Sequence, residues 1–138
     1  YEGNGPILKG NNNFETWRSA KLISRACIEG QFINMKIHSK WMNIIPDIIY
    51  VTGGASKNTE IVQILSDIFQ AKVQRQEVSG SVALGGAIRA AQHSSNFTLE
   101  ELESNFCNNS SEIISPNESN KEVYQKASEA IQSMLLTI

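Results

Sequence analysis

The pattern of apolar and polar residues predicts four substantial helices and two strands. Apolar residues recur at helical spacing in four segments, which we expect to form helices, namely 17–38, 61–69, 82–91 and 123–135. Two shorter runs, 47–51 and 72–75, are typical of strands, and the first is apolar enough for a strand covered on both faces. The sequence therefore indicates an α/β fold.

The first strand, the helix 61–69 and the second strand follow one another as a β-turn-α-β unit, in which the strands run parallel. Two consecutive glycines, Gly53 and Gly54, allow the turn after the first strand to be sharp and to approach a ligand closely. Asn58 or Ser56 can cap the first turn of the helix. Free N–H groups and the positive end of the helix dipole favour an anion or a ribose edge there. We expect this turn to bind a phosphorylated ligand.

The packing of the other helices is less closely specified by the sequence. We expect the helix 17–38 to be mostly buried, and its interior Gly30 indicates either a close approach of another backbone or ligand, or a tolerated glycine. Ser79 or Ser81 can cap the helix 82–91, whose Gly85 and Gly86 favour tight packing on the sheet.

The segment 94–120 is polar, and we expect an insertion or loose connection there, with a possible short helix at 99–106. Two strands alone make a poor sheet with free edges. We therefore expect residues upstream of this chain to complete the sheet, which would make the chain a fragment that could also associate with itself.

Composition narrows the class of protein. The 138 residues suit one domain, the net charge of −2 gives no basic field for nucleic acid, and no apolar run approaches the ~20 residues of a membrane helix. The two cysteines, Cys27 and Cys107, lack metal-ligand spacing. No signal peptide is visible, so we expect a cytoplasmic protein with reduced thiols.

The glycine turn matches other catalytic motifs only in part. Residues 54–58 approach the Gly-x-Ser-x-Gly nucleophile elbow, but Asn58 stands where that motif needs glycine, and His93 has no evident aspartate partner. Phosphate loops with a Gly-Lys-Ser/Thr ending and Gly-x-Gly-x-x-Gly runs are absent. A hydrolase is disfavoured.

Three segments together resemble the FGGY carbohydrate kinases, and in particular the xylulokinase branch of that family. The central one is Ile-Tyr-Val-Thr-Gly-Gly-Ala-Ser-Lys-Asn at 49–58 with the helix and strand 64–73 behind it. Arg-Ala-Cys-Ile-Glu-Gly-Gln-Phe at 25–32 and Ala-Leu-Gly-Gly-Ala at 83–87 flank it in the same order and spacing. The resemblance covers residues 17–91.

The resemblance implies an actin-like ATPase fold built from ribonuclease-H-like domains, of which residues 1–138 would be the C-terminal portion of the second, nucleotide-side domain. It implies phosphoryl transfer from ATP, with Mg²⁺ held mainly through the nucleotide, to a ketopentose. By motif, ATP contacts fall on Gly53, Gly54, Ala55, Ser56 and Asn58.

The family's catalytic aspartate lies outside the matched segments, so neither Asp47 nor Asp67 is assigned that role, and no metal ligand is assigned. The expected partners are the rest of a kinase chain, a sugar and ATP, with neither nucleic acid nor membrane. The alternatives are another FGGY sugar or polyol kinase, or a non-catalytic nucleotide-binding module of the same fold.

Overall fold

The computed structural model describes residues 20–76, 80–107 and 109–135. In these residues, five α-helices and three strands follow in the order α1 (Ala20–Ser39), β1 (Ile48–Val51), α2 (Thr59–Phe69), β2 (Lys72–Gln76), α3 (Ser81–Ser94), α4 (Leu99–Phe106), β3 (Asn109–Ile114) and α5 (Lys121–Leu135). Short 3-10 turns are formed by η1 (Lys40–Met42), η2 (Gly54–Lys57) and η3 (Glu118–Asn120).

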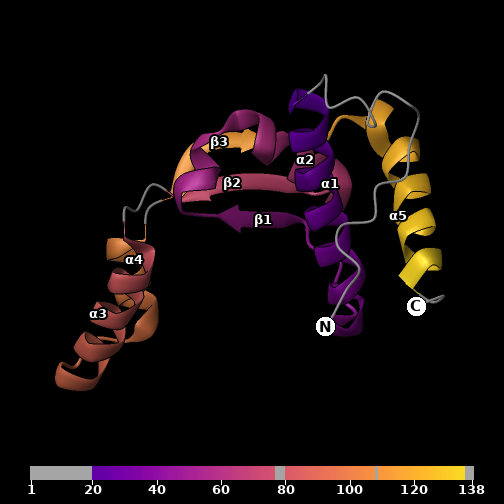
Figure 1. The fold of residues 1–138 in the computed structure, drawn as a ribbon. Helices are drawn as coiled ribbons and strands as arrows, with labels where there is room; N and C mark the ends of the chain where they lie inside the picture. The colour runs from indigo at the N-terminus through magenta and orange to yellow at the C-terminus, as the bar shows by residue number, and fades with distance from the viewer. Residues whose placement is uncertain (1–19, 77–79, 108, 136–138) are drawn as a thin grey trace.

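The sheet has the strand order β1-β2-β3, with β1 and β2 parallel and β3 antiparallel to β2 (Figure 1). The predicted β-turn-α-β unit with parallel strands is confirmed. The expectation of only two strands is wrong, because β3 lies inside the polar segment 94–120. That segment is therefore not loose throughout, while its status as an insertion stays a prediction.

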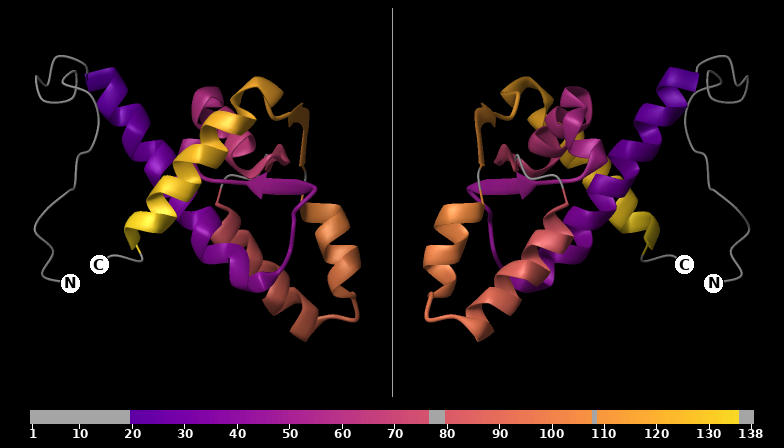
Figure 2. Two further views of the ribbon diagram at one scale, coloured as in Figure 1. Left: turned by 90° about the vertical axis from the view of Figure 1, so that its right-hand side faces the viewer. Right: turned by 90° about the vertical axis from the view of Figure 1, so that its left-hand side faces the viewer.

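Helices α1, α2 and α5 form a layer on one face of the sheet (Figures 1 and 2). The amphipathic helix α2 lies at its centre and contributes to both hydrophobic clusters. One cluster joins α2 to the sheet through Val62, Leu65, Val73 and Ile114. The other joins α2 to α1 and α5 through Ile33, Ile64, Ile68 and Tyr124. The core is thus built around α2, which places the start of this helix rigidly at the edge of the sheet.

The opposite face of the sheet carries no helix among the described residues. Tyr50 of β1 and Ile113 of β3 stand on that face and are 53% and 47% exposed. The expectation that β1 is covered on both faces is therefore not met. Nor is α1 mostly buried, since Ile33 is its one fully buried side chain. In both cases the apolar side chains would need more protein surface to bury them than the described residues provide.

Helices α3 and α4 pack on each other and extend from the edge of the sheet where β1 and β2 end (Figure 1). The predicted tight packing of α3 on the sheet is wrong, because a Cβ added at Gly85 or Gly86 would meet nothing within 4 Å. The same holds at Gly30, which fits the tolerated-glycine alternative. The N-cap of α3 is Gly80 rather than Ser81, and Ser79 lies outside the described residues.

A buried carboxylate ties the chain after β3 to α2. Asp67 Oδ1 accepts hydrogen bonds from Gln63 Nε2 at 2.8 Å and from the backbone N–H of Asn117 at 2.7 Å. Asp67 Oδ2 accepts a third from Asn120 Nδ2 at 2.8 Å. Asp67, only 2% exposed, thus has hydrogen-bond partners for its buried charge and holds the start of α5 in place.

Candidate functional site

The turn between β1 and α2 is shaped by one glycine in an unusual conformation. Gly53 has φ 90° and ψ −176°, which residues with a side chain rarely adopt. The backbone N–H and the hydroxyl of Ser56 both donate to the Gly53 carbonyl, at 3.3 and 2.7 Å. A Cβ added at Gly53 or Gly54 would meet nothing within 4 Å, so the backbone here faces open space. We call residues 52–58 the glycine loop.

Asn58 closes the glycine loop and begins α2. Its Oδ1 accepts hydrogen bonds from the backbone N–H groups of Glu60 at 3.0 Å and Ile61 at 3.3 Å. Of the two predicted caps, Asn58 is therefore the one observed, while the hydroxyl of Ser56 lies within the turn before it. The first turn of α2 thus lies directly beside the glycine pair, with its dipole favouring an anion.

Arg75 of β2 braces this loop from the neighbouring strand, a role that the sequence analysis missed. Its Nε donates to the Ser56 carbonyl at 2.8 Å and its Nη2 donates to Thr59 Oγ1 at 2.9 Å. The parallel register pairs Arg75 with Val51, the last residue of β1, and so places both at the carboxyl edge of the sheet. A basic residue at the carboxyl end of the second predicted strand was the signal available in the sequence.

A cavity between α3 and α4 adjoins the glycine loop. Its volume is about 380 Å³, and its polar and charged lining residues are Gln76, Ser81, Arg89 and Glu103. Thr52 Oγ1 donates to Ser81 Oγ at 3.2 Å, so the start of the glycine loop touches a residue that lines the cavity. The rest of the lining is mainly apolar, with Leu84 and Ile88 among its residues.

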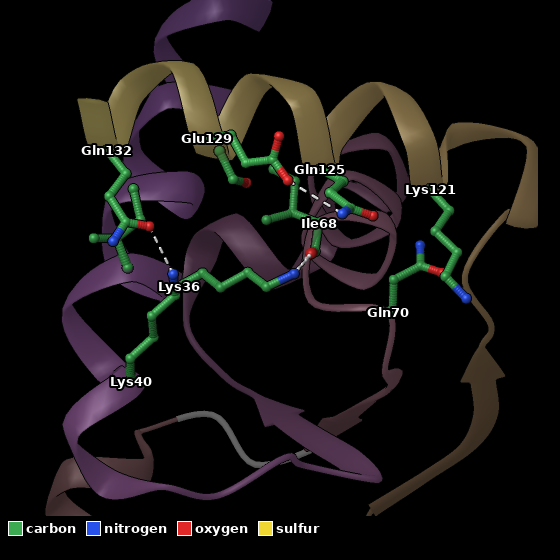
Figure 3. Close-up of a pocket in the computed structure, with 10 residues that line it drawn as sticks. Lys36, Lys40, Ile68, Gln70, Lys121, Gln125, Glu129 and Gln132 are labelled. Carbon is green, nitrogen blue, oxygen red and sulfur yellow. Dashed lines mark hydrogen bonds between the residues drawn. The ribbon is translucent and has the colours of Figure 1, made fainter. Parts of the chain in front are cut away.

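A second cavity, of about 260 Å³, lies between α1, the end of α2 and α5 (Figure 3). Lys36, Lys40 and Lys121 line it. Lys36 Nζ donates to the Ile68 carbonyl at 2.5 Å, and Lys40 Nζ donates to Gln132 Oε1 at 2.8 Å. Burial lowers the pKa of Lys36, and the charge of Lys40 lowers it further. Since these two ammonium groups already serve helix packing, we assign this cavity no ligand.

All the residues predicted to contact ATP lie together in the glycine loop, which contains no carboxylate. Asp47 lies at the other end of β1, where its carbonyl accepts from the Lys72 N–H at 3.1 Å. Among the described residues, no group of three or more His, Cys, Asp or Glu side chains is placed to hold a metal ion. The described helices likewise include none that is long and apolar enough to span a membrane. The loop offers N–H groups, hydroxyls and the ammonium of Lys57, all of which suit the binding of an anion.

Comparison with known proteins gives the site its family context. Residues 10–93 match the description "FGGY family of carbohydrate kinases, C-terminal domain". The chain is 42% identical over 69 residues to a xylulose kinase of Rattus norvegicus, an alignment that covers 48% of this chain and 13% of that protein. The chain thus spans a small part of the length of this relative.

Two crystal structures from Lactobacillus acidophilus share the fold. A gluconate kinase aligns with a TM-score of 0.69 and 26% identity, covering 81% of this chain and 23% of that one. A ligand-bound xylulose kinase aligns with a TM-score of 0.68 and 25% identity over the same shares. Because the match to the family's C-terminal domain covers more than half of the sequence, this chain belongs to the FGGY family of carbohydrate kinases and lies within their C-terminal domain.

Proposed function

We propose that this chain is the ATP-side part of a carbohydrate kinase that phosphorylates D-xylulose. The observation that carries the proposal is the glycine loop at the carboxyl edge of the sheet, where ligands bind in open α/β sheets. Kinases of the FGGY family use ATP, and a loop without side chains at Gly53 and Gly54 leaves room for its phosphates.

The residues of the glycine loop divide into two roles. The backbone at Gly53, Gly54 and Ala55, next to the first turn of α2, would bind the nucleotide phosphates. Ser56 and Asn58 hold the shape of the loop, because their side chains bond to its own backbone or to that of α2. Because the loop has no carboxylate, Mg²⁺ would be held mainly through the nucleotide, where it would neutralise charge on the phosphates.

The adenosine part of ATP fits the cavity between α3 and α4. A volume of about 380 Å³ lies within the range of small-molecule pockets. Gln76 and Ser81 provide polar groups on the side of the glycine loop, while Leu84 and Ile88 provide apolar surface for a flat base. Thr52, bonded to Ser81, joins the two halves of this nucleotide site.

The choice of sugar follows from the relatives. The rat protein is a xylulose kinase, as is one of the similar structures, which favours xylulose. The other similar structure is a gluconate kinase, so gluconate is the second candidate. The choice between the two sugars is made by assay.

We further propose that the chain works within a longer cytoplasmic polypeptide, because it covers 13% of the rat relative. The remaining chain would supply the catalytic aspartate, the sugar contacts and a strand along β1. Strand β1 stands at an edge of the described sheet, close in sequence to Trp41 and Ile45, which are 83% and 91% exposed. A sheet edge beside apolar surface is a place where another strand adds.

The test is an ATP-coupled assay, across a panel of sugars, of the kinase that contains this chain. We expect turnover of xylulose, and we expect Gly54→Val to raise the Michaelis constant for ATP far more than that for the sugar. Gly86→Val is the matched control, because Gly86 is equally open but lies outside the cavity lining. An unchanged Michaelis constant for ATP in a folded Gly54→Val enzyme would contradict the nucleotide site.

A further inference from the structure

Arg75 connects three parts of the chain that are far apart in the sequence. We propose that Arg75 is a positioning residue, which holds the glycine loop in its nucleotide-binding shape while Glu112 of β3 fixes the direction of the guanidinium. The inference rests on the proposed function, since it concerns how the same loop is held. It adds β3, a strand that the sequence did not reveal, to the parts of the chain on which binding depends.

The geometry uses three donors of one planar group. Nε donates to the Ser56 carbonyl at 2.8 Å, Nη2 to Thr59 Oγ1 at 2.9 Å, and Nη1 to Glu112 Oε2 at 2.5 Å. These acceptors belong to the glycine loop, the first turn of α2 and β3. The Arg75 side chain is only 19% exposed, so its position is restricted. A lysine ammonium lacks the planar fork that serves three acceptors in fixed directions.

The contact to Ser56 controls the direction of the loop backbone. The carbonyl of a trans peptide and the N–H that follows it point in opposite directions. When Arg75 binds the Ser56 carbonyl, it also fixes the plane of the Ser56–Lys57 peptide, and with it the N–H of Lys57 within η2. This peptide lies in η2, directly before the capping residue Asn58 and beside the proposed phosphate site. Loss of Arg75 therefore frees a peptide plane at the proposed phosphate site.

The pairing with Glu112 argues that Arg75 acts through the loop rather than by contacting phosphate. Its Nη1 already donates to the carboxylate of Glu112, and its other two hydrogen bonds are made to the loop and to α2. Glu112 is 57% exposed, and ion pairs with such exposed partners add little to stability. The main consequence of removing either partner is thus expected in the order of the loop.

The experiment uses the kinase that contains this chain and MgADP as the probe, with affinity measured by calorimetry and loop order by amide hydrogen exchange. Arg75→Gln should weaken MgADP binding about tenfold, as expected for losing charge-assisted hydrogen bonds. Glu112→Gln, at an exposed position, should weaken it less, and both should speed exchange of the amides at 54–59 without nucleotide. Arg75→Lys should resemble Arg75→Gln, because charge alone does not set the loop.

Arg25→Gln is the matched control. Arg25 also donates to a carboxylate and a hydroxyl, those of Glu29 and Tyr124, but it belongs to α1 and its partners lie on α1 and α5. This variant should leave MgADP affinity unchanged. If the wild-type kinase binds and Arg75→Gln binds equally well, the inference is overturned while the proposed function stands. If Arg75→Lys binds like wild type, charge rather than positioning is responsible, which also overturns it. Failure of the wild-type kinase to bind would overturn the proposed function and the inference together.

Discussion

At the scale of single residues, Gly53 and Asn58 determine the shape of the turn after β1. Gly53 has a positive φ of 90°, whereas the φ of Gly54 is not positive. The sequence pointed to the glycine pair but not to which member needs its conformational freedom. That distinction separates two roles: Gly53 is required by backbone geometry, and we propose that Gly54 is required by the space that a ligand would occupy.

Asn58→Ala should lower the free energy of unfolding by about 1 kcal/mol, since two N–H groups of α2 lose their side-chain acceptor. Asn58→Asp should retain most of that stability, because aspartate offers the same acceptor and a charge that suits the helix dipole. Urea unfolding of the three proteins measures both effects. Equal losses in the two variants would show that the cap does not stabilise α2.

Tyr124 gives the chain a defined response to alkaline pH. Its hydroxyl donates to Glu29 Oε1 at 2.8 Å and accepts from Arg25 Nη2 at 3.3 Å. Burial, followed by the bond to Glu29, raises the pKa of Tyr124 above 10.0, while Arg25 lowers it in part. The folded state therefore holds this proton more tightly than the unfolded state does. The resulting stability is complete below pH 10 and is lost as the pH rises through the folded-state pKa.

We therefore expect the free energy of unfolding to fall as the pH is raised past about 10, and to fall less in Tyr124→Phe. Lys36 has a lowered pKa and contributes the opposite slope, but it is present in both proteins and cancels in their difference. Urea unfolding over a pH series gives the comparison. Identical pH dependence in the two proteins would exclude Tyr124 as the source.

At the scale of elements, β3 is the least expected part of the fold. Residues 109–112 are Asn, Ser, Ser and Glu, which favour loops, and only Ile113 and Ile114 match a strand. Pairing with β2 and burial of Ile114 to 8% exposure override that local preference. The side chain at 113 faces away from the helices and remains 47% exposed.

These neighbouring isoleucines test whether β3 is part of the core. Ile114→Ala should lower the free energy of unfolding by about 2–4 kcal/mol through lost burial and a cavity beside Val73. Ile113→Ala should cost less than about 1 kcal/mol, because its side chain is already half in water. Thermal or urea unfolding measures both. Similar losses for the two variants would mean that β3 is not placed as described.

Elements with strong local signals were predicted well from the sequence. The short helix expected at 99–106 is observed as Leu99–Phe106, where Thr98 and Glu101 form a reciprocal capping box. Long-range relations were not predicted. The hydrogen bond from Arg75 to Glu112 joins residues 37 positions apart. The small residues of α3 allow close packing, but they do not show whether another element packs against them. Periodicity reports which face is apolar, whereas the partner of that face depends on the fold.

At the scale of the whole molecule, the described residues leave much apolar surface in water. Trp41, Ile44 and Ile45 are 83%, 70% and 91% exposed, and they lead directly into the edge strand β1. Exposed apolar surface of this kind marks a contact site. The kinases that match this chain are much longer than it is. We therefore propose that this exposed surface contacts the remaining part of the kinase chain.

From this we expect the 138-residue chain alone to show no sugar-dependent consumption of ATP. Phosphoryl transfer requires a base and sugar contacts, which we place in the remainder of the kinase. An ATP-coupled assay with xylulose measures this, with the longer kinase as the positive control. Turnover by the 138-residue chain would contradict the division of roles between the two parts.

The central claim is that the glycine loop and the α3–α4 cavity together form the nucleotide site. It is tested most directly by titrating the ¹⁵N-labelled chain with MgADP and following the amide resonances. We predict that the resonances of residues 53–58 and of the cavity-lining residues Ser81 and Gly85 shift together with one dissociation constant. Shifts confined to the cavity lined by Lys36, Lys40 and Lys121, or no shifts at all, would contradict the account.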